Sequence, residues 1–242
     1  MIVRDEGSTF LLVTQPHHAQ LAAEIVSAIS TEPPLAGAHR RSILLATREH
    51  DNGWIEVDAE PTIDPATGRP SDFIVGPPEV KHELWPRGIR RVGRSDPRAG
   101  ALVAEHALTV DSYRRHEIGW ATFFHTIASL RDALLERIGA ATGEDREAFQ
   151  AEYRSVRLGD SLSLQFCSGW REPHPTLGYE ASMEGGTLVV TPDPFGGAVV
   201  PVRVIGRRIP ARRYRDDADL RATLAAVTPE VVAGQARGSG RS

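Results

Sequence analysis

The spacing of apolar residues along the chain predicts a protein that is mostly helical. After Thr14, the residues Leu21, Ile25 and Ile29 recur on one helical face, and Pro16 suits the first turn behind a Thr14 cap. The same periodicity returns in later segments that proline, glycine or a capping residue delimits. We therefore expect helices over residues 14–30, 39–51, 96–110, 112–139, 144–167 and 217–226.

Shorter apolar runs near the two ends of the chain predict β-strands. Residues 1–14 hold two such runs around a polar turn, as in a hairpin. Within residues 185–215, β-branched residues predict three more strands, over 187–191, 199–205 and 209–214. We expect these strands and the hairpin to form one small antiparallel sheet on the helical body. The predicted fold class is thus mainly α, with a small antiparallel β-sheet.

Two segments are expected to lack regular structure. Residues 55–97 contain many prolines, glycines and short polar stretches, which indicate a long irregular loop. Loops of this length are often functional when they are ordered. The glycine-rich end, residues 234–242, is expected to be a disordered tail. Residues 1–233 are then expected to form a single domain.

Composition and charge limit the binding partners and the cellular compartment that we expect for this protein. The 242 residues are 40% hydrophobic and 25% charged, with a formal net charge of -4, so no overall positive field favours nucleic acid or an anionic membrane. A small-molecule substrate is the expected partner, and the oligomeric state stays open. A single cysteine, Cys167, excludes a disulfide within the chain. With neither a signal peptide nor a membrane-spanning run expected, we predict a cytoplasmic protein.

The adjacent residues His50 and Asp51 are the first candidates for chemistry. They fall at the end of the helix predicted over 39–51, where one metal ion could collect both side chains. An imidazole nitrogen with a carboxylate oxygen suits Zn, Mn, Fe or Co better than Ca. The alternative interpretation is a histidine that interacts favourably with the dipole at a helix C-terminus.

Three further ionisable residues fall on apolar faces of predicted helices. His18 shares the stripe of Ile25, His106 lies on the inward face of the helix over 96–110, and Asp160 lines up with Leu164. A buried carboxylate is costly unless it is paired or bound to a metal. A shared metal ion would explain all of these positions at once. The alternative is a hydrogen-bonded polar network in the core.

Five short segments carry a resemblance to a known family. They are TQPHHA at 14–19, HDNGW at 50–54, TGRP at 67–70, DSLSL at 160–164 and PDPF at 192–195. Together they resemble the bacterial domain-of-unknown-function family 3891 (DUF3891). The order of an early His, a His-Asp pair, later histidines and a late Asp is also similar to the metal-ligand pattern of the HD superfamily.

This resemblance implies an HD-like helical bundle with metal ligands on facing helices. His18, His50, Asp51 and Asp160 would hold a first divalent ion, which could be Mn, Fe, Zn or Co. His106 would join a second ion, together with either His116 or His125. Periodicity favours His116, whereas the family-like spacing favours His125.

The hypothesis that follows is a metal-dependent hydrolase, acting on a phosphoester or phosphoanhydride in a small molecule. Asp51 would orient or deprotonate the attacking water, with His106 as a second catalytic group. Two alternatives are an HD-type di-iron oxygenase and a non-catalytic protein that binds a metal or a ligand. A substrate pocket under the long loop is predicted from four residues, Trp54, Arg69, Phe73 and Trp85.

Overall fold

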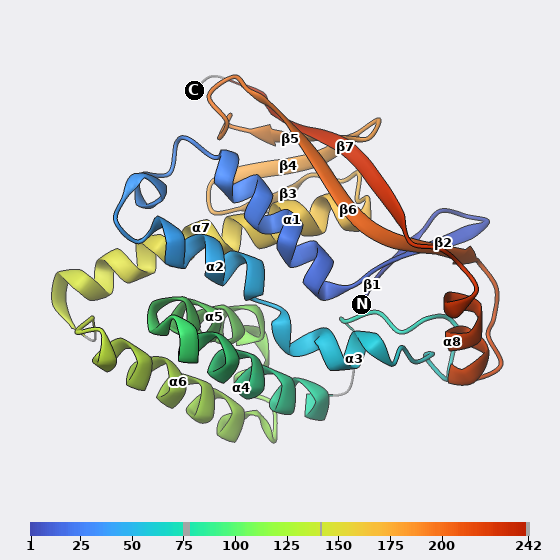
Figure 1. Ribbon diagram of the computed structural model, residues 1–242, viewed down its shortest axis with the longest axis horizontal. Coiled ribbons are helices and arrows are strands. Elements are labelled where there is room, and N and C mark those ends of the chain that lie inside the picture. Colours follow the sequence, from blue (N-terminus) through green and yellow to red (C-terminus); the bar gives the residue numbers. More distant parts are fainter. Residues whose placement is uncertain (75–77, 141, 241–242) are drawn as a thin grey trace.

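A computed structural model describes residues 1–74, 78–140 and 142–240 of the chain. Most of its helices lie in two layers on one side of a curled β-sheet (Figure 1), and the last helix packs on the opposite face of the sheet. The helices are α1 (Gln15–Ala28), α2 (Arg40–Glu49), α3 (Ile55–Ala59), α4 (Pro78–Ser95), α5 (Pro97–Val110), α6 (Trp120–Arg137), α7 (Gly143–Ser168) and α8 (Asp217–Ala225). Three short 3-10 turns accompany them: η1 (Pro33–Ala36), η2 (Asn52–Trp54) and η3 (Ser112–Arg114).

Local sequence signals set the ends of the helices that later form the site. The hydroxyl of Thr14 accepts the backbone N–H of His17 at 3.3 Å and caps α1. The carboxylate of Asp96 accepts the N–H of Ala99 at 3.0 Å and caps α5 in the same way. Gly169, with a φ of 67°, ends α7 in the left-handed conformation that favours glycine. These helices lie where the apolar periodicity predicts them.

The long loop predicted over 55–97 is wrong at both of its ends. Residues 55–59 form α3 and residues 78–95 form α4. Pro86 and Gly88 lower the intrinsic helix propensity of α4, which is why the sequence pattern indicated a loop. Burial of Leu84 and Ile89 against the rest of the core supplies the stabilisation that local propensity lacks.

The helix predicted over 112–139 is shorter than expected. Its N-terminal part is the separate turn η3, and α6 begins only at Trp120. The residue before it, Gly119, has a φ of 89°, which no right-handed helix accommodates. From Trp120 onward, Phe123 and Ile127 face the core.

All strands of the described residues belong to one sheet. They are β1 (Ile2–Asp5), β2 (Thr9–Val13), β3 (His174–Thr176), β4 (Tyr179–Glu184), β5 (Thr187–Thr191), β6 (Val199–Pro210) and β7 (Glu230–Gly238). Their order in the sheet is β1-β2-β6-β7-β5-β4-β3. The β5–β7 pair is parallel, and the other neighbouring pairs are antiparallel.

The predicted HD-like bundle with a small antiparallel sheet is therefore wrong, because the described strands form a seven-stranded, mixed and curled sheet. Strand β7 occupies part of the segment expected to be a disordered tail. Its sequence, EVVAGQARG, has few apolar residues, but its backbone pairs with β6 on one side and β5 on the other. Non-local pairing with β5 and β6, and not the apolar pattern of its own sequence, therefore decides the structure of β7.

Strand β6 runs through the gap between the two strands predicted at 199–205 and 209–214. Gly206 resembled a break between them, yet it lies within the strand and pairs with Val13 of β2. A Cβ at this position would approach Leu11 Cδ1 to 2.7 Å, so glycine permits close packing here. One half of β6 pairs with β7 and the other half with β2 (Figure 1).

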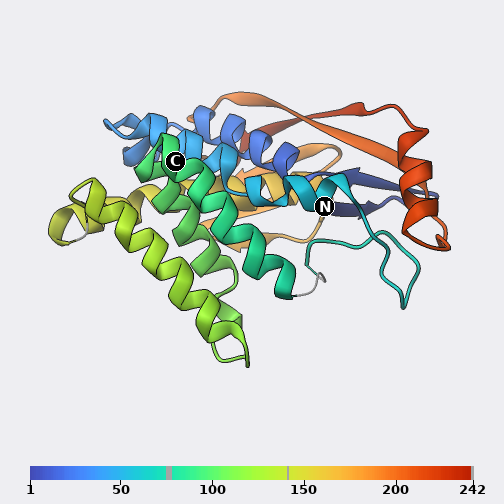
Figure 2. The same cartoon turned by 60° about the horizontal axis from the view of Figure 1, so that its bottom comes forward.

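Helices α1 and α7 pack together beneath the sheet and form the inner helical layer. Helix α5 contacts both α2 and α7, while α4 and α6 cover its outer side. Figure 2 shows these green and yellow-green helices farthest from the orange and red strands. A smaller second core lies beside α8 and consists of Phe10, Leu12, Ile209, Tyr214, Leu220 and Leu224. Among the described residues, no helix is both long enough and apolar enough to cross a membrane.

Candidate metal centre

Four helical segments bring five ionisable side chains together. His18 comes from α1, His50 and Asp51 follow α2, His106 lies on α5, and Asp160 lies on α7. All five residues are at most 5% exposed. Unpaired burial of so many polar groups would be costly, so their mutual contacts have to compensate for the loss of water.

The Nε2 atoms of His18 and His50 form the centre of the cluster and lie 3.1 Å apart. Asp51 Oδ2 lies 3.2 Å from the first and 3.4 Å from the second. Asp160 Oδ1 lies 3.5 Å from both. Ligands bound at 2.0–2.2 Å are separated by about 3.0 Å in an octahedron and about 3.4 Å in a tetrahedron. The separations among the His18, His50 and Asp51 atoms, 3.1–3.4 Å, are those of ligands around one ion.

Hydrogen bonds on the far side of each ring determine which nitrogen faces the centre. His50 Nδ1 donates to the carbonyl oxygen of Thr47 at 2.7 Å. Ser163 gives its hydroxyl proton to the carbonyl oxygen of Asp160 at 3.0 Å, so its oxygen accepts from His18 Nδ1 at 2.9 Å. In the neutral form, both rings then present an unprotonated Nε2 to the centre. Two facing lone pairs require a shared proton or a cation, and a metal ion fits this requirement.

The charges within the cluster stabilise one another. Burial by itself lowers the pKa of His50, but the Asp51 and Asp160 carboxylates outweigh it and raise that pKa to about 10. Burial would raise the pKa of both carboxylates, yet the imidazoles hold them well below their usual range. Without a metal, the cluster thus retains a proton beside two carboxylates. A divalent cation would replace that proton.

His106 lies at the edge of the cluster. Its Nε2 is 3.9 Å from Asp160 Oδ2, and its ring centroid is 4.7 Å from that of His50. Burial lowers the pKa of His106 to about 3, which keeps the ring neutral and able to donate a lone pair. His50, His106 and Asp160 form a second group that could hold a metal ion, next to the group of His18, His50 and Asp51.

The structure does not bring His116 or His125 to the cluster. Both are exposed: His116 precedes α6, and His125 lies on its solvent face. The prediction of His125 as a ligand is corrected by the orientation of α6, which turns Phe124 and Ile127 inward instead. The buried face of α6 is formed by Trp120, Phe123, Phe124 and Ile127, and His125 lies outside it.

A cavity of about 440 Å³ opens onto the cluster. His18, Asp51, His106 and Asp160 line it on one side. Trp54, Phe73 and Trp85, which the sequence placed in a substrate pocket, also line it. A site of this size, with apolar walls and a few convergent polar groups, suits a small molecule.

Arg69 does not reach this cavity, which corrects its prediction as a pocket residue. Its guanidinium pairs with Asp5 at 2.6 Å and lies 4.6 Å from the ring centroid of Phe10. Strand β1 and the loop around Arg69 are neighbours only in the folded chain, so no local signal reveals this pair.

Two cationic residues of the cavity, Arg157 and Lys81, were not predicted from the sequence. Arg157 lines the cavity and donates to Asp160 Oδ2, one helical turn from its own position on α7. Its spacing of three residues from Asp160 was a signal that could have identified it. Lys81 also lines the cavity and pairs with buried Asp111 at 2.8 Å. Lys81 lay in the segment expected to be a loop, so no periodicity marked it.

The fold and the site together define an α+β protein with a buried His/Asp cluster, beside a cavity, that could hold a metal ion. The family of proteins of unknown function DUF3891 matches residues 1–211, and the chain belongs to this family. The resemblance read from the five sequence segments is thereby confirmed. Neither the curated proteins nor the solved structures include a match to this chain.

Proposed function

We propose that the protein hydrolyses a phosphoester or phosphoanhydride bond in a small molecule with the help of a divalent metal ion. One observation carries the proposal: two imidazoles with their Nε2 atoms turned inward face two carboxylates beside a cavity. A closed structural site would lack such a cavity. The mixed nitrogen and oxygen ligands suit Mn, Fe, Zn or Co.

Each residue of the cluster would have its own role in this reaction. His18, His50, Asp51 and Asp160 would hold the ion. A bound divalent ion polarises a phosphoryl oxygen and makes water acidic near neutral pH. Asp51, which lines the cavity, would accept a hydrogen bond from the attacking water and orient it. His106 is neutral and buried, and would either join a second ion or contact the substrate.

Positive charge in the cavity would stabilise the substrate's phosphoryl oxygens. Arg157 is 27% exposed at its side chain and contacts Asp160 through only part of its guanidinium. Its remaining N–H groups are suited to phosphoryl oxygens, which guanidinium groups bind with good geometry. Lys81 adds a second cation on the cavity wall. The aromatic side chains of Trp54 and Trp85 would pack against an apolar part of the substrate.

Metal content tests the first half of this proposal. The purified protein is expected to bind a stoichiometric transition-metal ion, and Asp160→Ala and His50→Ala are expected to lose it. His125→Ala is the matched control, because that histidine is exposed on α6 and should leave metal binding unchanged. Retention of a full metal complement by Asp160→Ala would remove that residue from the ligand set.

Hydrolysis tests the second half. The metal-loaded protein is assayed against a panel of phosphomonoesters, phosphodiesters and nucleotides, with release of phosphate or of the leaving group as the readout. Arg157→Gln is expected to keep the metal and lose about 10²-fold or more in rate, as when an electrostatic stabiliser is removed. If no member of the panel is hydrolysed by the metal-loaded protein, the proposal of phosphoester or phosphoanhydride hydrolysis is abandoned.

A second candidate function, a di-iron oxygenase, is favoured by one observation. The group of His50, His106 and Asp160 lies beside the first group and shares His50 with it, so two ions could bind close together. Two irons per chain, together with an optical change on exposure of the reduced protein to oxygen, would support oxygen chemistry. One ion per chain, or a metal without redox chemistry, would support hydrolysis.

A further inference from the structure

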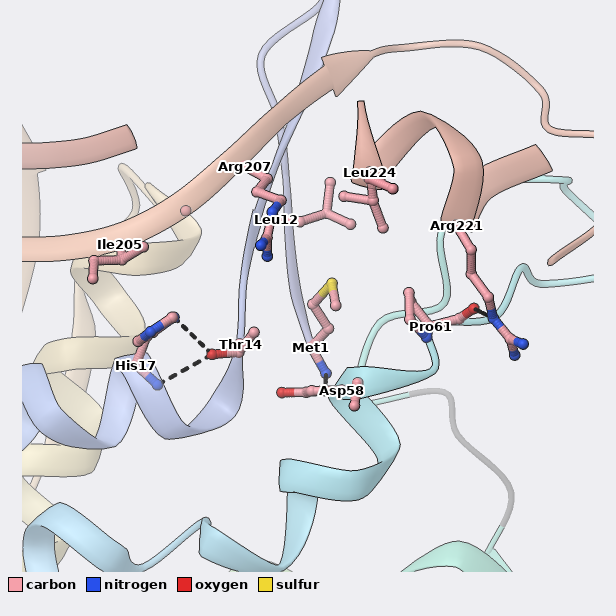
Figure 3. Close-up of a pocket in the computed structure, with 13 residues that line it drawn as sticks. Met1, Leu12, Thr14, His17, Asp58, Pro61, Ile205, Arg207, Arg221 and Leu224 are labelled. Carbon is pink, nitrogen blue, oxygen red and sulfur yellow. Dashed lines mark hydrogen bonds and ion pairs between the residues drawn. The ribbon is translucent and has the colours of Figure 1, made fainter. Parts of the chain in front are cut away.

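A second cavity, of about 350 Å³, lies where β6, the start of α1, the end of α3 and α8 meet (Figure 3). His17 lines it, whereas the next residue, His18, belongs to the metal cluster. Consecutive residues of a helix point about 100° apart, so the first turn of α1 separates the two sites. The two cavities have no lining residue in common, so the second cavity is a separate site.

Most of the wall of this cavity is aliphatic. Strands β2 and β6 supply one side, α8 supplies another, and the N-terminal residue fills the space between them (Figure 3). The apolar side chains are those of Met1, Leu12, Ala59, Pro61, Ile205, Leu224 and Ala225. Such a surface favours a ligand with a short hydrocarbon portion.

One charged group in the cavity has no partner of its own among the described residues. Arg207 lies opposite Leu12 in the β2–β6 register, so the two side chains share a face of the sheet. Figure 3 shows its guanidinium directed into the cavity, above Thr14. Within residues 1–74, 78–140 and 142–240, no carboxylate forms an ion pair with Arg207, and no acceptor forms a hydrogen bond with it.

The neighbouring arginines differ from Arg207 in this respect. Arg208 pairs with both Glu6 and Glu230. Arg221, which also lines the cavity, donates to the carbonyl oxygen of Pro61 at 3.0 Å. Arg207 is thus the cation of this cavity that is left to meet a ligand.

The one carboxylate in the wall is already engaged. Asp58 accepts the N–H of Gln15 at 2.6 Å through one oxygen, and the amino group of Met1 lies 2.7 Å from the other. It cannot turn to Arg207 without giving up these contacts. The ammonium of Met1 balances its charge, so the attraction of the cavity for an anion is left to Arg207.

We propose that this cavity binds a small monocarboxylate with a short aliphatic chain. The carboxylate would accept two parallel N–H bonds from Arg207, the geometry that guanidinium and carboxylate groups favour. The chain would pack against Leu12, Ile205 and Leu224. A phosphate group carries further charged oxygens, which the mostly aliphatic wall could not solvate.

Titration with hexanoate, followed by NMR chemical shifts of the full chain, tests this site. Saturable shifts of the Arg207 side chain and of Leu224 are expected at millimolar hexanoate, with much weaker binding of 1-hexanol and of inorganic phosphate. Arg207→Gln should weaken hexanoate binding about 10-fold or more, the effect expected for a charge-assisted pair. Arg208→Gln is the matched control and should bind hexanoate as the parent does.

A second variant tests the site at an exposed position, where a substitution should not prevent folding. Ile205 is 42% exposed, so Ile205→Glu should fold, and its carboxylate should repel hexanoate. Absence of saturable shifts in the parent, or unchanged binding by Arg207→Gln, would overturn the proposal. Tighter binding of phosphate than of hexanoate would overturn the assignment to carboxylates. The titration needs no metal, so its outcome does not depend on the metal-centre proposal.

Discussion

Replacing Gly159 by alanine should disturb the metal centre without touching a ligand. Gly159 precedes Asp160 on α7 and faces α1, which carries His18. A Cβ at this position would overlap Val26 Cγ2 and would lie 3.1 Å from the carbonyl oxygen of Ala22. It would also lie 3.0 Å from Thr47 Cγ2, on the helix that leads to His50. The glycine thus lies in the contact between three helical segments that carry the candidate ligands.

Two opposing effects determine the cost of Gly159→Ala. Alanine favours a helix interior over glycine by up to about 1 kcal/mol. Overpacking of a close-packed core costs about 1–3 kcal/mol, and here neither the stiff Val26 side chain nor the backbone of Ala22 can move aside easily. A net loss of about 1–2 kcal/mol in unfolding free energy is therefore expected.

The effect on metal binding should be larger than this loss of stability suggests. Restoring ordinary carbon contacts requires α1 and α7 to separate by about 0.5–1 Å. Metal–ligand bonds tolerate deviations of only about 0.2 Å, and His18 and Asp160 lie on the two helices that separate. Metal affinity is expected to fall about 10–100-fold, as when groups that orient ligands are lost.

Urea unfolding of the metal-free protein and competitive metal titration would measure the two quantities. The double variant Gly159→Ala with Val26→Ala is the matched control, because removal of the Val26 methyl groups makes room for the new Cβ. It should recover much of the lost affinity relative to Gly159→Ala. Unchanged metal affinity in Gly159→Ala would refute the idea that this helix contact sets the ligand geometry.

Four further results are expected. Ser163→Ala removes the partner of His18 Nδ1 and should weaken metal binding about 10–100-fold, as measured by metal titration. Unchanged affinity would show that this hydrogen bond does not orient His18. Because the pKa of His50 is raised from 6.5 to about 10, its imidazolium stabilises the metal-free fold fully below pH 6.5, and this contribution is lost as the pH rises towards 10. Metal must displace that proton, so apparent affinity should rise with pH by up to about tenfold per unit, and a flat profile over pH 6–9 would contradict a protonated cluster. Lys81→Met leaves buried Asp111 without its cation and should cost about 3–5 kcal/mol in urea unfolding, while the double variant with Asp111→Leu should recover most of that loss.

The candidate site was largely predictable because it depends on local helix geometry. A helix buries one face, so the apolar neighbours of His18, His106 and Asp160 reveal that these residues point inward without any knowledge of the fold. The prediction failed for His116, which periodicity had placed on the helix expected over 112–139, because that helix begins only at Trp120 after Gly119. His125, which family-like spacing had favoured, lies on the exposed face of α6. Position on a helix is informative only where the helix boundaries are correct.

The sheet, α4 and the cavities were decided by the tertiary structure. Strand β7 has little apolar character of its own and becomes a strand because β5 and β6 lie on either side of it. Helix α4 forms despite Pro86 because its buried face packs on α5. Arg157 and Lys81 reach one cavity, and Arg207 reaches another, through contacts between distant segments. The chain by itself therefore determined which residues point inward, because that follows from local periodicity. The folded structure decided what those residues meet, since strand pairing and helix packing join positions that no local pattern relates.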